Sequence, residues 1–203
     1  NAEESGLIVD IGRWVLDEAC RQTAVWNERS PQPLSMNVNV SAVQLRHPSF
    51  VGDVVRTLHA HDLDPALLVL EITESVLAES AQCRDALQQL RATGVGLAID
   101  DFGTGYSSLA YLHRMPVTCV KIDRAFIAEL DQATDSSLTH SVLMLAQSLG
   151  LDTVAEGVET QEQLEVLAQL NCGLVQGYHI LRPQPPEEID RIVAELGVAA
   201  REA

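Results

Sequence analysis

The sequence predicts an α/β fold of the TIM-type (β/α)8 barrel class, lacking about the first two strands. Short, mostly apolar segments alternate with segments of helical periodicity, which is typical of parallel strands covered by helices. Six successive strands each carry a polar residue at or near the carboxyl end. In a barrel these ends converge on one mouth, whereas an open sheet concentrates its ligand groups at a switch point. A closed barrel takes about 250 residues, so the chain is short by roughly two strands.

The predicted elements follow from apolar periodicity and from residues that begin or end helices. Ser30-Pro31-Gln32-Pro33 ends the first helix, Thr93-Gly94 ends a later one, and Thr160 with Gln163 forms a capping box. Trp14 and Trp26 are expected to pack on helix faces. We expect strands at 36–40, 67–72, 95–99, 118–122, 151–155 and near 174–175. We expect helices over about 6–28 and beginning near 50, 76, 107, 138, 160 and 186.

Composition and charge restrict the partners of the protein. The chain carries 13 Lys and Arg against 29 Asp and Glu, a net charge of −16, and 46% of its residues are hydrophobic. This apolar content supports an aliphatic core, and the negative charge disfavours unaided binding to DNA or to an anionic membrane. No segment approaches the length of a membrane-spanning helix, and four widely spaced cysteines favour a reduced, cytoplasmic setting. A phosphate ligand would therefore need a cation.

We interpret residues 1–203 as one domain that is truncated at its N-terminus. The chain begins with Asn1 rather than Met and enters an apolar periodic segment within a few residues. Such a beginning is typical of an excised domain, and it agrees with the shortfall of strands. The parent protein is then expected to be longer, and could be anchored to a membrane.

Polar residues at the strand ends form the predicted site. They are Asn39, Glu71, Asp100, Asp101, Lys121, Glu156 and Gln176. Carboxylates gathered in one mouth repel one another unless divalent cations lie among them, and hard oxygen ligands favour Mg2+ or Mn2+ over Zn2+. Adjacent Asp100 and Asp101 can reach two ions about 3.5–4 Å apart, an arrangement used for displacement at phosphorus. Lys121 could then steady a hydroxide, and Glu156 could take a proton.

Each of these residues also has an ordinary structural interpretation. A single Asp or Glu after a strand is often a helix N-cap or a solvated loop residue. Lys121 could be a surface residue whose stem covers the strand, and Asn39 and Gln176 could satisfy backbone groups. After the paired aspartates, Phe102-Gly103-Thr104-Gly105-Tyr106-Ser107 is interpreted as a loop that bends closely or moves, with a plain turn capped by Ser107 as the alternative.

Several segments of the sequence resemble the EAL domain of bacterial cyclic di-GMP phosphodiesterases. They are Asn39-Val40-Ser41, Glu71-Ile72-Thr73-Glu74, Asp100–Ser108, Lys121-Ile122-Asp123, Ala155–Thr160 and Gln176-Gly177-Tyr178. The resemblance implies a (β/α)8 barrel that hydrolyses cyclic di-GMP to linear pGpG with Mg2+ or Mn2+, and that Ca2+ inhibits. It also implies a homodimer formed through the region after the paired aspartates, and sensory or cyclase domains in the parent protein.

The resemblance assigns a role to each matching residue. It implies that Asn39, Glu71, Asp100 and Asp101 are metal ligands and that Glu156 is a ligand or proton acceptor beside the ions. It implies that Lys121 contacts the attacking water, that Gln176 lies near the metal site, that Glu74 anchors the loop and that Glu159 is a second acidic residue of the mouth. The Glu-Ala-Leu motif that gives the family its name, and that supplies a further metal ligand, is absent from the 203 residues.

Three functions remain open at this point. The first is a metal-dependent cyclic di-GMP phosphodiesterase that lowers the second messenger in bacterial signalling. The second is a catalytically silent domain that binds cyclic di-GMP and regulates a partner, which the missing motif motivates. The third is a barrel enzyme that abstracts a proton next to a carbonyl, with Lys121 as the base and the carboxylates holding one Mg2+.

Overall fold

The protein consists of two compact units, each assembled from separate stretches of the chain. A computed structural model describes residues 2–77, 80–103, 112, 115–131 and 137–202. The first unit comprises Asn1–Glu71, Ser80–Gly96 and Pro183–Ala203, and the second comprises Ile72–Glu79 and Leu97–Arg182. The strand order is the chain order, β1 to β6, and the registered pairs are parallel. The predicted α/β class with parallel strands is therefore confirmed.

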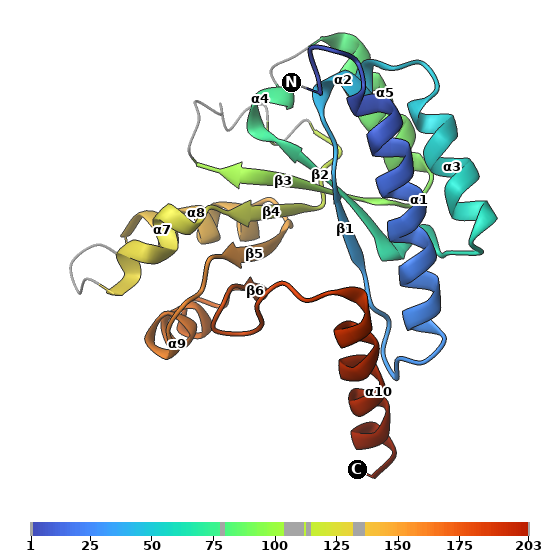
Figure 1. The fold of residues 1–203 in the computed structure, drawn as a ribbon. Helices are drawn as coiled ribbons and strands as arrows, with labels where there is room; N and C mark the ends of the chain where they lie inside the picture. Colours follow the sequence, from blue (N-terminus) through green and yellow to red (C-terminus); the bar gives the residue numbers. More distant parts are fainter. Residues whose placement is uncertain (1, 78–79, 104–111, 113–114, 132–136, 203) are drawn as a thin grey trace. The chain divides into compact units, whose positions relative to one another are not determined.

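The first unit places a layer of helices beside strand β1. Its helices are α1 (Ile8–Asn27), α2 (Ala42–Arg46), α3 (Phe50–Ala60), η1 (Pro65–Leu67), α5 (Ala81–Ala92) and α10 (Pro186–Glu202), and its strands are β1 (Met36–Asn39) and β2 (Leu68–Thr73), whose end passes into the second unit. Helix α1 contacts α3 and β1, and α3 contacts α5 (Figure 1). The register sets Asn39 opposite Glu71, so two predicted site residues are paired on neighbouring strands.

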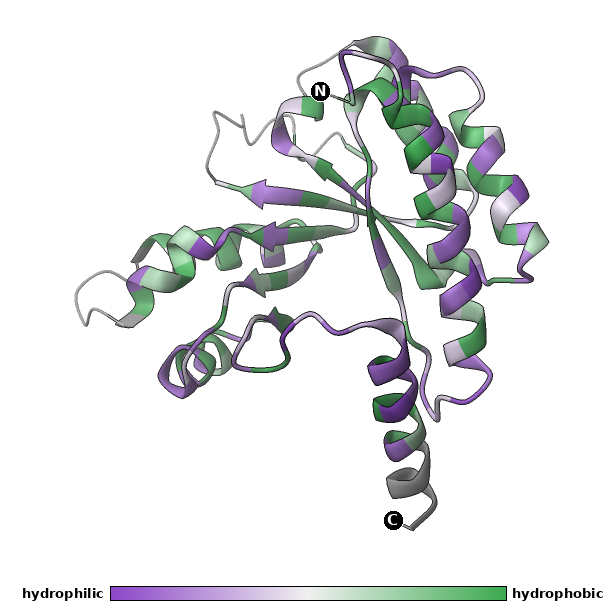
Figure 2. Ribbon diagram, in the orientation of Figure 1, coloured by the Kyte–Doolittle hydropathy of each residue, from purple (hydrophilic) through white to green (hydrophobic). Residues whose placement is uncertain are grey.

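The second unit contains the other four strands. Its strands are β3 (Gly96–Phe102), β4 (Cys119–Ile122), β5 (Asp152–Glu156) and β6 (Leu174–Gln176), and its helices are α4 (Glu74–Leu77), α7 (Arg124–Ala128), η2 (Glu129–Asp131), α8 (Ser137–Ser148) and α9 (Gln161–Gln169). Figure 2 shows β3 and β4 as largely hydrophobic strands with a hydrophilic segment near the carboxyl end. The helix predicted from about residue 107 begins outside the described residues.

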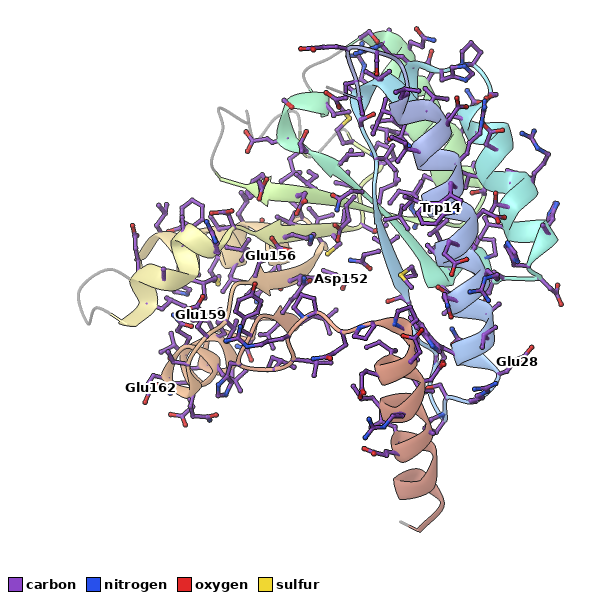
Figure 3. The ribbon with its side chains drawn as sticks, in the orientation of Figure 1. Trp14, Glu28, Asp152, Glu156, Glu159 and Glu162 are labelled. Carbon is purple, nitrogen blue, oxygen red and sulfur yellow. The ribbon has the colours of Figure 1, made fainter. Side chains whose placement is uncertain are left out.

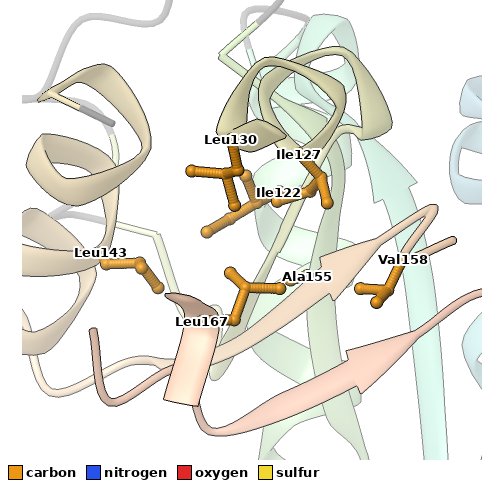
Figure 4. Packing of buried hydrophobic residues seen from close by; sticks show 7 residues of the cluster. All are labelled: Ile122, Ile127, Leu130, Leu143, Ala155, Val158 and Leu167. Carbon is orange, nitrogen blue, oxygen red and sulfur yellow. The ribbon is translucent and has the colours of Figure 1, made fainter. Parts of the chain in front are cut away.

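An aliphatic cluster holds β4, β5 and their covering helices together. Ile122 and Ala155 from the strands pack with Ile127, Leu143 and Leu167 from α7, α8 and α9, and all five are fully buried (Figure 4). Burying one such Ile or Leu side chain stabilises the fold by about 1.5–3 kcal/mol. The cluster therefore gives the polar carboxyl ends of β4 and β5 a rigid base.

Three features of the elements differ from the sequence-based prediction. Helices α2 and α7 were missed because five residues are too short to show a period. Strands β3, β5 and β6 extend through their polar residues, since backbone pairing continues beyond the apolar run. Strands β1 and β6 are not covered on both faces as the predicted parallel strands are, because their alternate side chains are exposed.

The apolar face predicted for α1 is not the face that the structure buries. Trp14 is 68% exposed, and the buried residues of α1 are Leu16, Cys20 and Thr23. The expectation that Trp14 packs against the protein is wrong for this structure. Trp26 is partly buried, and its indole Nε1 donates to Asp190 Oδ1 on α10 at 2.9 Å. Helical periodicity identifies apolar stripes, but only tertiary packing decides which stripe is covered.

Gly12 allows α1 to approach α2 closely. A Cβ atom at Gly12 would overlap the side-chain amide of Gln44. The Gln44 side chain is already hydrogen-bonded in the capping box of α2. Its Oε1 accepts from Ser41 N at 3.1 Å, and Ser41 Oγ accepts from Gln44 N at 3.2 Å. The conformation of the capping box that follows Asn39 therefore depends on the glycine at position 12.

Gly12→Ala is expected to lower the free energy of unfolding by about 1 kcal/mol, because displacing Gln44 costs more than the helix propensity gained. Thermal unfolding should show a fall of about 2–4 °C. Gly52→Ala is the matched control, since the new Cβ would meet only the Arg56 guanidinium, at 3.4 Å, and the substitution should be neutral or stabilising. Equal melting temperatures for both variants would contradict the close approach.

Candidate active site

The paired aspartates lie at an irregularity in β3. The β3–β4 register shifts between Ile99 and Phe102, and Asp101 has a φ of +52°. A bulge of this kind turns side chains away from strict alternation and is common beside active sites. The left-handed region is more accessible to Asp and Asn than to most residues. Consecutive carboxylates can therefore serve one site, which regular β alternation would prevent.

Lys121 lies between two carboxylates from the neighbouring strands. Its Nζ is 2.9 Å from Asp100 Oδ1 on β3 and 2.6 Å from Glu156 Oε1 on β5. The lysine is only 4% exposed. The alternative of a surface lysine whose stem covers the strand is therefore wrong. Two acidic partners offset the cost of burying one ammonium group.

Three carboxylates of the second unit gather closely enough to hold a cation. One oxygen from each of Asp100, Asp101 and Glu156 lies within 4.8 Å of the others. A set of hard carboxylate oxygens fits Mg2+ or Mn2+, and a cation would balance the charge that Lys121 alone leaves uncompensated. The donor chemistry of these residues therefore fits a divalent ion.

A pocket of about 310 Å³ opens beside this group. Its lining comes from Asp101 of β3, Asp123 and Arg124 after β4, the segment that begins with Glu156 at the end of β5 and includes Gly157 and Glu159, and residues 176–178 from the end of β6. The backbone of Val158 fixes the last segment, because its N–H donates to Gln176 O at 3.1 Å and its carbonyl accepts from His179 N at 3.0 Å. Gln176 and Glu159 thus line the same pocket as Glu156, which ends β5 (Figure 3).

Comparisons with known proteins match this arrangement. The model of the EAL domain family matches residues 1–183. The chain belongs to the EAL domain family. It is 47% identical over 195 residues to the bifunctional diguanylate cyclase/cyclic di-GMP phosphodiesterase MucR of Pseudomonas aeruginosa, covering 95% of this chain and 28% of that protein. It is 42% identical over 186 residues to the cyclic di-GMP phosphodiesterase NbdA of the same species, covering 91% of this chain and 24% of that protein.

A solved structure shares the fold of this EAL domain. The PaMucR phosphodiesterase in complex with c-di-GMP superposes with a TM-score of 0.87 at 47% identity, covering 93% of this chain and 77% of that one. The chain therefore has a six-stranded part of the α/β barrel fold of EAL domains, as predicted. It spans about a quarter of the length of these two curated relatives. Within the described residues, no helix combines the length and the apolar character needed to cross a membrane.

The first unit of the EAL domain contains two of the predicted metal ligands. Asn39 is exposed at the end of β1, and Glu71 is buried at the opposite position of β2. Asn37 Nδ2 donates to Glu71 Oε1 at 2.7 Å. Sequence reasoning missed Asn37, although its two-residue spacing from Asn39 places both side chains on one strand face. That all the predicted residues share a single mouth stays a prediction.

Glu74 contacts the beginning of the loop after the paired aspartates. Its Oε2 accepts from the Gly103 backbone N–H at 3.3 Å. Gly103 has a φ of +99°, and a Cβ there would lie 2.8 Å from the Phe126 ring, so this position requires glycine. Phe102 is buried at the end of β3. The remaining predicted loop residues, 104–107, lie outside the described residues, so an anchoring role for Glu74 stays a prediction.

Gln163 is a buried residue that the sequence indicated only as a helix cap. Its Oε1 accepts from Glu159 N at 2.8 Å and from Thr160 N at 3.2 Å, and its Nε2 donates to Ile127 O at 3.3 Å. One side chain therefore joins the segment after β5 to helix α7. The Thr160–Gln163 capping box was predicted and is confirmed, whereas the bond to α7 depends on tertiary packing.

The carboxyl group of Asp101 is destabilised in its charged form. Desolvation by the surrounding protein raises its pKa, and the Asp100 charge and a hydrogen bond with Asp123 raise it further, while Lys121 opposes them. Below its ordinary pKa the group is protonated in the folded and unfolded chain alike. As the pH rises through the higher folded pKa, the folded state loses stability relative to the unfolded state.

Asp101→Asn is therefore expected to stabilise the metal-free EAL domain at neutral pH. The gain should be under about 1 kcal/mol because the side chain is exposed, or about 1–3 °C in melting temperature. In EDTA, the difference between the variant and the wild type should grow as the pH is raised from about 4 to about 7. Mn2+ should reverse the order by stabilising the wild type more. A difference that is constant across this pH range would exclude the carboxyl group as its cause.

Proposed function

We propose that this EAL domain hydrolyses cyclic di-GMP to linear pGpG with Mg2+ or Mn2+. The observation that carries the proposal is the cluster of Asp100, Asp101 and Glu156 around buried Lys121, beside an open pocket. The cyclic di-GMP phosphodiesterase relatives and the c-di-GMP complex of PaMucR support the substrate. The proton-abstracting alternative is disfavoured, because the Lys121 ammonium group is already engaged by Asp100 and Glu156.

The proposed metal ligands are the polar residues predicted at the strand ends. Asp100, Asp101 and Glu156 would hold a cation, and Asn39 and Glu71 are proposed as further ligands. When bound, such ions polarise a phosphoryl oxygen and lower the pKa of water. The protein's own contribution is to keep the carboxylates in place, through the β3 bulge at Asp101 and the Asn37–Glu71 hydrogen bond.

The proposed reaction is an in-line displacement at one phosphorus atom. A water oxygen forms a bond to phosphorus, the bond from phosphorus to the 3′-oxygen breaks, and the released 3′-oxygen takes up a proton. Lys121 orients the attacking water and stabilises the negative charge that develops beside it. Glu156 accepts the proton that the water loses. Gln176 and Glu159 line the pocket that receives the nucleotide, and Glu74 supports the loop through Gly103.

The setting of the domain is part of the proposal. The matched relatives are several times longer than this chain, and MucR is described as carrying a cyclase activity as well. We therefore place this EAL domain in a longer cytoplasmic signalling protein with sensory or cyclase domains. The region after the paired aspartates is proposed to form a homodimer interface.

The test is hydrolysis of cyclic di-GMP by the purified chain with Mn2+, Mg2+, Ca2+ or EDTA. We expect pGpG to form with Mn2+ and Mg2+ and to be absent with Ca2+ and EDTA, as separated from substrate by chromatography. Equal hydrolysis in EDTA would overturn metal dependence. Tight binding of cyclic di-GMP without any product in Mn2+ would instead assign the chain as a silent receptor.

A further inference from the structure

Among the described residues that line the pocket beside the carboxylate cluster, one is cationic. Asp101, Asp123, Glu156 and Glu159 contribute four carboxylates to its described lining, and Arg124 contributes the one guanidinium. A dianionic nucleotide that enters such a pocket meets like charge on most sides. The lysine of the site does not relieve this, because Lys121 is already held between Asp100 and Glu156.

The chain positions Arg124 at the beginning of α7, directly after β4. The Asp123 carboxylate caps this helix by accepting from Ala125 N at 2.8 Å. Gly157, which follows Glu156 and has a φ of +72°, lies so close that a Cβ there would overlap the Arg124 side chain. The glycine therefore lets the stem of Arg124 pack against the segment that carries Glu156.

A second contact holds the same two segments together. Gln163 accepts from Glu159 N and donates to Ile127 O on α7, and it is buried. Helix α7 and the segment 156–160 are thus connected at Arg124 and again at Ile127, one turn further along the helix. A side chain on such a base is preorganised with respect to the pocket.

The guanidinium of Arg124 is available to a ligand. It is exposed, and it makes no ion pair or hydrogen bond with any residue that the structure describes. Other arginines of the chain are engaged, since Arg13 contacts Asp53 and Arg21 contacts Glu18. An unengaged guanidinium in an acidic pocket lacks an internal partner and matches the bidentate geometry of a phosphate.

We propose that Arg124 is a substrate-binding residue that holds a phosphate group of the cyclic dinucleotide. This inference rests on the proposed function, because it takes cyclic di-GMP as the ligand. Arg124 supplies affinity through its charge and planar donors, whereas the carboxylate cluster supplies the chemistry. The residue therefore acts on binding rather than on bond cleavage.

The test compares Arg124→Gln with Arg124→Lys and with Arg29→Gln. Arg29 is the matched control, because it is an exposed arginine between α1 and β1, outside the pocket, and its loss changes the net charge equally. Binding of cyclic di-GMP is measured by calorimetry in Ca2+ over a series of salt concentrations, and kcat and KM are measured in Mn2+. Thermal unfolding verifies that all variants fold.

Arg124→Gln is expected to weaken binding about tenfold, the size of a hydrogen bond to a charged group, and to make binding less sensitive to salt. Arg124→Lys should restore part of the loss, kcat should change less than KM, and Arg29→Gln should match the wild type. If the wild type binds cyclic di-GMP without cleaving it and Arg124→Gln shows the same loss of affinity, the inference is supported. The function is then reassigned to a receptor.

Three results overturn the inference. If the wild type binds but Arg124→Gln has the affinity and salt dependence of Arg29→Gln, Arg124 does not hold the phosphate, and the proposed function is unaffected. Arg124 is likewise excluded as the phosphate ligand if Arg124→Gln binds more weakly but keeps the salt dependence of the wild type. If the wild type neither binds nor cleaves cyclic di-GMP, the proposed function falls, and this inference falls with it.

Discussion

Lys121→Met is expected to reduce hydrolysis of cyclic di-GMP by about 10²–10⁴-fold, the range for loss of a group that stabilises developing charge or assists proton transfer. The substitution keeps the length of the side chain but removes the cation that Asp100 and Glu156 share. The two carboxylates then repel each other, so the metal-free variant should also be destabilised by about 3 kcal/mol, as in a broken buried ion pair. Initial rates of pGpG formation and denaturant unfolding measure the two effects.

Two controls test the role of Lys121: rescue of the variant by Mn2+ and chemical modification of the lysine amine. Mn2+ should restore most of the lost stability of Lys121→Met but not its activity, because an ion replaces the charge without replacing the ammonium donor. Lys121 is the one lysine in the sequence, so an amine-directed reagent reports on this side chain and the chain terminus alone. If Lys121→Met retains more than about a tenth of the wild-type rate, Lys121 takes no part in the mechanism.

Asp100→Asn is expected to lower hydrolysis by at least about 10³-fold, since removal of one fixed donor in an anion-stabilising site already costs about 10²–10³. Asparagine has nearly the same shape and leaves an oxygen that Lys121 can contact, so the fold should persist. The substitution removes the charge of one of three clustered carboxylates, and cation binding should weaken accordingly. The measurement is the rate in Mn2+ together with the rise in melting temperature that Mn2+ produces.

Asp152→Asn is the matched control for Asp100→Asn. Asp152 begins β5 and is exposed, whereas Glu156 ends the same strand inside the carboxylate cluster (Figure 3). Its loss changes the net charge by the same amount but should alter neither the rate nor the response to Mn2+. If the two aspartate variants behave alike, the effect comes from overall charge, and the cluster is not the metal site.

Much of the fold follows from local pattern. The six strands and most helices were predicted within a few residues, because buried parallel strands read as apolar runs and amphipathic helices repeat every 3.6 residues. The polar residues near strand ends followed from the same pattern. Helix α1 shows the limit, since the predicted Trp14 face is exposed and the face containing Leu16 and Cys20 is buried.

The residues that sequence reasoning missed are those whose roles depend on distant partners. Asn37 on β1 contacts Glu71 on β2, and Gln163 on α9 contacts Ile127 on α7. Arg124 is adjacent to a predicted motif, but its place in the pocket depends on the close approach of Gly157. The hydrophobic periodicity of the sequence does not predict such contacts, because each joins residues more than thirty positions apart.

The sequence by itself determined the fold class, the acidic character of the strand ends and the resemblance to EAL domains, because these properties belong to residue types and their spacing. Only the tertiary structure decided that Lys121 is buried between Asp100 and Glu156 and that a β3 irregularity brings Asp101 beside them. The physical reason is that strand register, backbone bulges and desolvation arise from pairing between separate strands, so they exist only once the chain has folded.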